Sequence, residues 1–289
     1  MSKKLIKDSF SLRTLFLIGA TLQSLLTIVL PIHYALLPTF ALLIHTIATT
    51  IHAVITFRQP GSVPTVLSPA THHNAPIPGR TSTRLPLASY DPSKSQTPFT
   101  SPPPGGVVVL HLCVRFTHPL GYLAPGGREV AAHFMACNKR VFQSITSSSS
   151  PTSSKDKDQK AQDFGCLGYS TWRGDSLPTS NSLLTIYYFR DIAGLNKFAH
   201  DRVHREAWEW YNADFVKKLG YSHIGVMHEA FYADERGWES IALNMPPTLL
   251  GRGGVLVRNE ETGEGEWVTT LVDGRHPKLR SQLERMGRV

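Results

Sequence analysis

The pattern of hydrophobic and polar positions changes character several times along the chain. From Thr14 to Phe57, 44 consecutive residues carry no charged side chain, whereas about 20 apolar residues are enough for a helix to span a bilayer. Pro31 divides this stretch, so residues 1–57 are predicted to form a membrane anchor built as a helical hairpin. Polar residues in the second segment leave an interfacial helix open. A cleaved signal peptide is the competing interpretation, although the apolar stretch exceeds a usual signal core.

Two later segments lack any apolar periodicity. Residues 58–106 contain 11 of the 20 prolines, and such a composition cannot bury enough apolar surface to offset its ordering entropy. Residues 144–163 combine a serine run with alternating charges. We therefore expect a disordered linker over 58–106, a flexible insertion over 144–163, and a tail over 251–289.

Between these segments the apolar spacing alternates between strand and helix periods. Strand patterns occupy residues 107–117, 167–172, 183–189 and 223–232, and helical patterns occupy 129–145 and 195–216. The order βαββαβ predicts an α+β, ferredoxin-like domain over 107–250, with a four-stranded antiparallel sheet and both helices on one face. The other sheet face then requires a partner. A homodimer closing into a dimeric α/β barrel with an internal cavity follows as the expected assembly.

The charge distribution changes the meaning of the net charge of +8. Residues 1–106 carry eight Lys or Arg against two Asp or Glu, and residues 107–289 carry 22 against 20. Nucleic-acid binding is disfavoured, because it requires basic residues on a folded surface. The basic residues flank the hairpin instead, which predicts a membrane protein with its domain on the cytosolic side. We expect that membrane to be the endoplasmic reticulum. The three cysteines show neither disulfide nor zinc spacing.

The densest cluster of reactive side chains lies in the second predicted helix. His200, His204, Trp208 and Tyr211 fall at i, i+4, i+8 and i+11, which places them on one helix face. The residues between the two histidines exclude a metalloprotease motif. We predict that His204 takes part in catalysis and that His200, Trp208 and Tyr211 contact substrate, with packing at the sheet edge as the alternative.

The last strand adds further candidates. Alternation places His228 and Tyr232 on one side and Glu229 on the other. His228 is predicted as general base, its pKa lowered by apolar neighbours, and Tyr232 as a substrate contact. Glu229 joins His228 as a catalytic candidate only if the strand bulges. Otherwise pairing with an arginine such as Arg190 or Arg202 is the simpler role.

Several of these segments together resemble fungal members of the antibiotic-biosynthesis monooxygenase superfamily. The resemblance covers about residues 107–250 and is carried by His118-Pro119-Leu120-Gly121, Tyr187-Tyr188-Phe189-Arg190-Asp191, Phe198-Ala199-His200 with His204 and Ala207-Trp208-Glu209-Trp210, Ile224-Gly225-Val226-Met227-His228-Glu229, and Trp238-Glu239-Ser240-Ile241 with Asn244-Met245-Pro246. It implies a dimeric α/β barrel that oxygenates an apolar polyketide- or terpenoid-derived metabolite of secondary metabolism.

Cofactor use stays open at this stage. Residues 251–254 lack the strand, turn and helix context of a dinucleotide loop, and no cofactor motif is identifiable. A haem enzyme with His204 or His228 as axial ligand is one alternative. A ligand-binding or stress-response protein without catalysis is the other.

Overall fold

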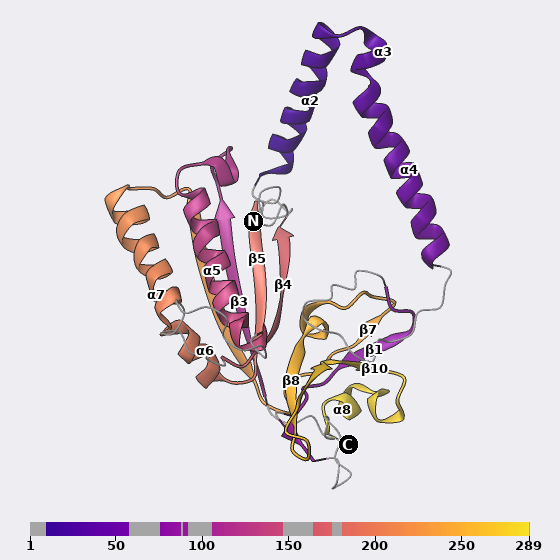
Figure 1. Ribbon diagram of the computed structural model, residues 1–289, viewed down its shortest axis with the longest axis vertical. Coiled ribbons are helices and arrows are strands. Elements are labelled where there is room, and N and C mark those ends of the chain that lie inside the picture. Colours follow the sequence, from indigo (N-terminus) through magenta and orange to yellow (C-terminus); the bar gives the residue numbers. More distant parts are fainter. Residues whose placement is uncertain are drawn as a thin grey trace.

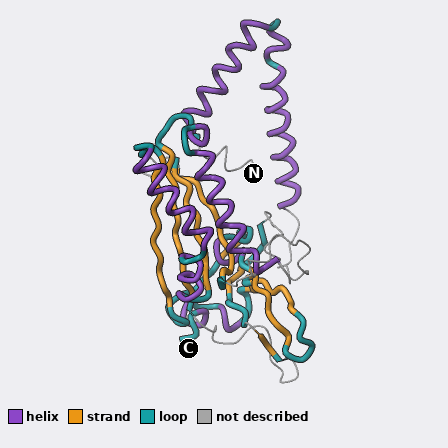
Figure 2. The backbone as a smooth tube through the Cα atoms, turned by 60° about the vertical axis from the view of Figure 1, so that its left-hand side comes forward, coloured by secondary structure: helices purple, strands orange, loops and turns teal. Residues whose placement is uncertain are grey.

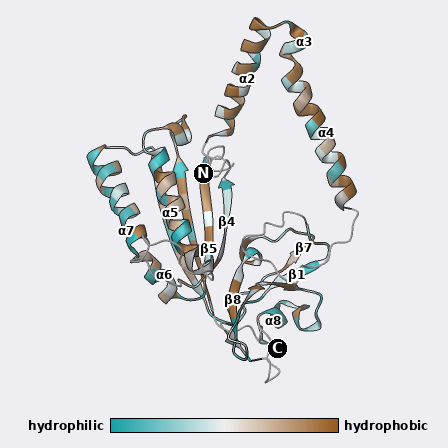
Figure 3. Cartoon of the chain, viewed as in Figure 1, coloured by the Kyte–Doolittle hydropathy of each residue, from teal (hydrophilic) through white to brown (hydrophobic). Residues whose placement is uncertain are grey.

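The computed structural model describes residues 10–57, 76–87, 89–91, 106–146, 164–174 and 181–288. A helical hairpin comes first, with α2 over Leu12–Val29, a short α3 over Ile32–Ala35 and α4 over Leu37–Phe57. Pro31 stands at the break, as the sequence predicts. Gln23 Nε2 donates to Ala35 O at 3.0 Å and ties α2 to the turn. Figure 3 shows both long helices as predominantly hydrophobic, and both are long and apolar enough to cross a membrane.

The central sheet has four antiparallel strands in the order β4-β5-β3-β6. Their bounds are β3 Val107–Phe116, β4 Cys166–Gly174, β5 Ser182–Phe189 and β6 Ile224–Ala233. The helices α5 (Gly127–Thr146), α6 (Ile192–Ala199) and α7 (Arg202–Glu209) lie on one face of this sheet, as Figures 1 and 2 show. The expected mixed α+β architecture with an antiparallel sheet is confirmed.

The second predicted helix requires correction. In place of one helix over 195–216, α6 ends at Ala199, α7 begins at Arg202, and a π-helix continues over Trp210–Lys218. Asp201 causes the break, because its side chain caps α7 by accepting from Val203 N at 3.0 Å. Its carboxylate also pairs with Arg140 Nη2 of α5 at 2.9 Å, and both side chains are more than 90 % buried.

The disorder predicted for the linker over 58–106 is wrong where that segment forms strands, and the segment that was predicted as a tail, 251–289, also forms regular structure. Residues from both segments build a second module beside the sheet: β1 (Arg80–Thr83) pairs with β7 (Ala242–Leu243) and β10 (Leu271–Asp273), whereas β2 (Ser89–Tyr90), β8 (Gly254–Asn259) and β9 (Gly265–Thr269) form another small sheet. The short helix α8 (Gln282–Arg285) follows, and Arg285 Nε donates to Glu239 Oε2. Much of the linker, and the insertion between Thr146 and Phe164, lies outside the described residues.

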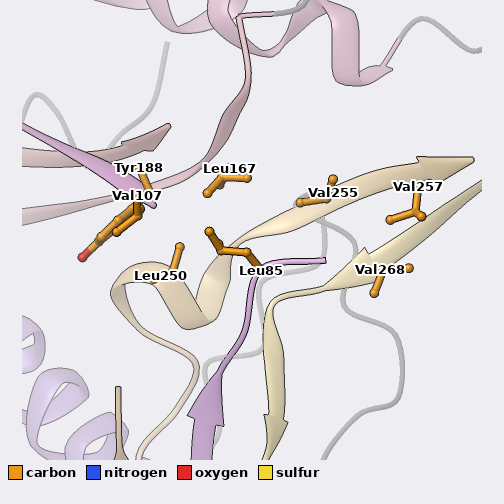
Figure 4. Close-up of a cluster of buried hydrophobic side chains, with 8 residues drawn as sticks. All are labelled: Leu85, Val107, Leu167, Tyr188, Leu250, Val255, Val257 and Val268. Carbon is orange, nitrogen blue, oxygen red and sulfur yellow. The ribbon is translucent and has the colours of Figure 1, made fainter. Parts of the chain in front are cut away.

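This module covers part of the sheet face that the helices leave open. Figure 4 shows the buried cluster at the contact, in which Leu85 and Leu250 meet Val107, Leu167 and Tyr188. On the same face, Trp172, Met227 and Phe231 remain 45 %, 51 % and 52 % exposed. The chain therefore covers with its own residues part of the surface that was expected to meet a second copy.

Candidate functional site

A cavity of about 650 Å³ lies between the helix layer and the sheet. The alternate residues of β3 that face the helices, Leu110, Leu112 and Val114, form its floor. Helices α5, α6, α7 and the π-helix supply its other walls, with Val130, Phe134, Val141, Phe198 and Trp210 among the apolar side chains. A pocket of this size and lining fits an apolar small molecule held by a few polar groups.

His204 of α7 and His133 of α5 are the two half-buried histidines of this cavity, and His204 is the one whose pKa is lowered by burial. Its Nδ1 lies 3.0 Å from Ala199 O, and its ring packs against Phe198 with the centroids 5.2 Å apart. Because a carbonyl oxygen only accepts, Nδ1 carries the proton in the neutral ring and Nε2 is the basic nitrogen. Burial lowers the pKa of His204 below the ordinary value, the Ala199 hydrogen bond opposes this shift, and nearby His228 adds to it.

His200 also lines the cavity, at the end of α6. Its Nδ1 lies 2.8 Å from Asn196 O, so this ring has the same preferred tautomer as His204. The side chain is exposed. His200 is thus suited to donate or accept a hydrogen bond at the solvent side of the site.

His228 lies in the cavity wall but does not have the predicted environment. It stands opposite Leu112 in the pairing of β6 with β3 and faces the helices. The residue is nevertheless exposed, because β6 is an edge strand of the sheet. The expectation that apolar neighbours desolvate this imidazole is wrong, and His204 is the histidine that meets that condition.

Glu229 and Tyr232 do not join these histidines. Glu229 points to the opposite sheet face, where its Oε1 lies 3.2 Å from His111 Nδ1. Its partner among the described residues is thus a histidine rather than the predicted arginine. Tyr232 is exposed and its ring lies over Gly106, at the end of the strand beyond the cavity.

Trp208 and Tyr211 both reach the cavity in spite of the broken helix. The Tyr211 hydroxyl donates to Ile224 O at 2.8 Å and fastens the π-helix to β6. Burial raises the pKa of this hydroxyl, which therefore stays protonated. Trp208 is half exposed at the solvent side. Wider turns of this kind often occur at functional sites, and here the turn directs Trp210 to His133 of α5, with the ring centroids 4.9 Å apart.

Helix α5 and strand β5 contribute polar residues that the sequence analysis did not select. His133, Cys137 and Tyr187 line the cavity. Burial raises the pKa of Cys137 to about 11, so the thiol is protonated at neutral pH. The Tyr187 hydroxyl donates to Asn138 Oδ1 at 2.7 Å, and burial raises its pKa well above the ordinary value. In the sequence, the helical spacing of Val130, Phe134, Cys137 and Val141 could have indicated that α5 lines a site. The same spacing is equally typical of a helix that only packs against the core.

The His204 pKa gives a first testable expectation. If neutral His204 is the reactive form, kcat/KM should be constant near neutral pH and fall as the pH drops below the ordinary histidine value of about 6.5. The half-maximal point should lie below that value because burial disfavours the imidazolium. A pH profile of the wild-type protein and of His204→Gln measures this; a limb that persists unchanged in the variant belongs to another group.

Among the described residues, no group of three or more His, Cys, Asp or Glu side chains is arranged to hold a metal ion. The site offers a neutral imidazole, three further histidines, a protonated thiol and tyrosine hydroxyls around an apolar space. Such a set is chemically able to bind and orient a weakly acidic apolar ligand and to accept a proton from it.

Comparison with known proteins shows one extensive similarity. The sequence model of a family described as Monooxygenase af470-like matches residues 107–250. The chain is also 34 % identical over 283 residues to Monooxygenase af470 of Aspergillus fumigatus, covering 98 % of this chain and 90 % of that protein.

Solved structures show only distant likeness. An aldoxime dehydratase in complex with butyraldoxime is 12 % identical, with a TM-score of 0.32, over 66 % of this chain and 51 % of that one. A conserved protein of unknown function from Bacteroides thetaiotaomicron, titled a possible oxidoreductase, is 9 % identical, with a TM-score of 0.25, over 44 % of this chain and 97 % of that one. Likeness at this level carries no argument about activity.

Proposed function

Because the chain belongs to the monooxygenase af470-like family, we propose that it oxidises an apolar, polyketide- or terpenoid-derived intermediate of secondary metabolism inside the cavity. The chain is a monooxygenase, and therefore an oxidoreductase. The substrate class is supported by the cavity, whose floor and walls are mainly aliphatic and aromatic. Membership of the antibiotic-biosynthesis monooxygenase superfamily is part of the proposal.

The observation that carries the proposal is a neutral imidazole at an apolar cavity. His204 Nε2 is the basic nitrogen, and burial keeps it unprotonated at neutral pH. An enol, a phenol or a carbon acid next to a carbonyl group would lose its proton to this nitrogen. His200 and His228 at the exposed side would hydrogen-bond the substrate's oxygen atoms.

The reaction balances when the substrate itself supplies the electrons. Deprotonation of an activated CH2 group gives a carbanion that O2 oxidises. One oxygen atom becomes the new carbonyl oxygen, and the other leaves as water with the two hydrogens of the CH2 group. In this scheme His204 takes the first proton and returns it to the departing oxygen. A haem enzyme stays the alternative, with His204 or His228 as ligand.

The test of this function is oxygen incorporation. Purified full-length protein in detergent would be incubated with isotopically labelled O2 and a panel of terpenoid ketones and polyketide-type aromatic ketones, and products would be analysed by mass spectrometry. We expect one labelled oxygen atom per product molecule. Saturable binding of such compounds without any labelled product would instead indicate a ligand-binding protein. A Soret band in the visible spectrum would indicate the haem enzyme.

Membrane anchoring by α2 and α4 is a second part of the proposal, with the endoplasmic reticulum as the expected membrane and the domain on the cytosolic side. It is supported by the length and hydrophobicity of both helices and by the basic residues that flank them. After carbonate extraction the full-length chain should stay in the membrane pellet. Recovery in the supernatant would exclude integral insertion, because carbonate removes only peripheral proteins.

A homodimer of ferredoxin-like domains that closes into an α/β barrel is the third part. The exposed part of the sheet face supports it, since Trp172, Met227 and Phe231 form an apolar surface there. Sedimentation of the wild-type chain in detergent at micromolar concentration should give a dimer. Phe231→Asp should give a monomer, whereas Leu283→Asp on α8 should not. A wild-type monomer would remove this part of the proposal.

A further inference from the structure

One end of the domain exposes four large aliphatic side chains on two neighbouring segments. Leu120 and Leu123 lie between β3 and α5, and Val216 and Leu219 lie around the end of the π-helix; their exposed fractions range from 40 % to 54 %. We call residues 117–126 together with 215–223 the apical face.

The two segments of the apical face are joined by hydrogen bonds. Thr117 N donates to His223 O at 2.9 Å, and His223 Nε2 lies 2.8 Å from Pro125 O. Phe215 packs so close to Gly126 that a Cβ at this glycine would overlap the phenyl ring. The leucines are therefore held on one continuous, ordered surface rather than on two independent loops.

The first hydrophobic helix starts at this same end of the domain. Ser11, Arg13 and Thr14 share a cavity of about 440 Å³ with Thr117 and His118 of the apical face. Arg173 Nη2 also donates to Phe10 O at 2.6 Å. Figure 1 shows α2 rising away from this end of the sheet.

This attachment fixes the distance between the apical face and any membrane that α2 crosses. The 18 residues of α2 span about 27 Å as a helix, close to the roughly 30 Å thickness of the hydrocarbon core. Ser11, the N-cap of α2, must then lie at the interface. Because Ser11 and the apical face line one cavity, that face lies at the interface as well.

The charge around the apical face fits an anionic lipid surface. Lys217 and Lys218 end the π-helix, Arg128 lies in the first turn of α5, and Arg13 and Arg115 line the cavity at the start of α2. The nearby carboxylates within the described segments are Glu129 and Asp214. Exposed leucines surrounded by basic residues are typical of surfaces that rest in the headgroup region of a bilayer.

We propose that the apical face docks the catalytic domain directly on the membrane surface, with Leu120, Leu123, Val216 and Leu219 in the headgroup region and the basic residues against anionic phospholipids. This inference rests on the proposed anchoring by α2 and α4. The apical face would give the domain a second contact with the membrane besides the anchor helices. That contact would fix the orientation of the domain relative to the membrane surface.

The experiment places a nitroxide probe on the apical face of the full-length chain. Cys113→Ser and Cys137→Ala remove the two partly exposed thiols, and Leu123→Cys or Leu219→Cys then carries the label. Leu283→Cys is the matched control, because Leu283 and Leu219 are 53 % and 52 % exposed and Leu283 lies on α8. The chain is reconstituted in nanodiscs of phosphatidylcholine with phosphatidylserine.

The nitroxide's collision rates with O2, which is enriched in lipid, and with a water-soluble nickel complex are compared. Their ratio shows whether the label is immersed in the bilayer. We expect labels at 123 and 219 to be oxygen-accessible and protected from nickel, and the label at 283 to behave as in water. Immersion should weaken when phosphatidylserine is left out. Nickel accessibility at 123 and 219 equal to that at 283 would overturn the docking face.

A label-free measurement guards against a perturbed variant. Wild-type chain in the same nanodiscs should show slower hydrogen exchange over residues 117–126 and 215–223 than in detergent, with no change over 276–288. Carbonate extraction of the same chain in sedimentable liposomes of the same lipid composition separates the two levels of the proposal. A chain that stays in the pellet while its apical face remains exposed to water retains the anchor and loses the docking face.

Discussion

Replacing His204 with glutamine is expected to lower kcat by about 100-fold to 10,000-fold, the usual loss when a general base is removed. Glutamine keeps a hydrogen-bonding group at the position but cannot take up a proton. The imidazole it replaces has Nδ1 committed to Ala199 O and is neutral because of burial. Steady-state kinetics of product formation, together with the pH profile, measure the effect.

His228→Gln is the matched control from the opposite wall. His228 lines the same cavity but is exposed, so we expect a smaller effect that falls mainly on KM, through a lost hydrogen bond to substrate. A large loss of kcat in His228→Gln together with wild-type turnover in His204→Gln would reverse the two assignments and restore the role predicted from the sequence.

Replacing Arg140 with methionine is expected to lower the free energy of unfolding by about 3–5 kcal/mol, because it leaves a buried carboxylate without its partner. Arg140 Nε and Nη2 lie 3.0 Å and 2.9 Å from Asp201 Oδ2, and both side chains are buried. Arg140 Nη1 is buried without a hydrogen-bond partner among the described residues, which places the expected value toward the lower end. Urea unfolding followed by tryptophan fluorescence measures the change.

The surface pair on α7 supplies the control for this variant. Arg202 Nη1 lies 2.8 Å from Glu206 Oε1, with both groups largely in solvent. Arg202→Met should therefore cost about 0–1 kcal/mol. If Arg140→Met and Arg202→Met lowered the free energy of unfolding equally, the buried ion pair would contribute no more to stability than the surface pair.

The expected effects of His204→Gln on activity and of Arg140→Met on stability are connected through Asp201. Its Oδ2 holds Arg140, its Oδ1 caps α7, and His204 follows within the first turn of that helix. Arg140→Met should consequently affect activity as well, through the position of His204. Arg140 acts as a positioning residue, so we expect the His204-dependent limb of the pH profile to shift in this variant, a readout that loss of folded protein alone would not move.

The hairpin and the order of elements were predictable from the sequence, because each depends on local pattern. An uncharged run interrupted by Pro31 specifies two helices whatever surrounds them. Apolar spacing at strand and helix periods gave the central elements from Val107 to Ala233 in their correct order. The break at Asp201 was missed, because its cause is a capping bond and an ion pair with Arg140, which lies 61 positions earlier in the sequence.

The second module, formed by residues before and after the sheet domain in the sequence, could not be predicted from local pattern for a related reason. Strands β1 and β10 pair across 192 positions where Thr81 lies opposite Asp273, and neither strand is longer than four residues. Proline content therefore suggested disorder for a segment that long-range pairing orders.

The sequence by itself determined the residue types available for chemistry and the helical or extended spacing that brings His200, His204, Trp208 and Tyr211 toward one cavity. The tertiary structure alone decided which histidine has the properties of a base. Desolvation depends on how much of a ring the neighbouring elements cover: α6 and Phe198 cover His204, whereas His228 stays exposed on an edge strand. Alternation along β6 predicts on which face of the sheet a residue lies. How deeply that residue is buried depends on the elements packed around it.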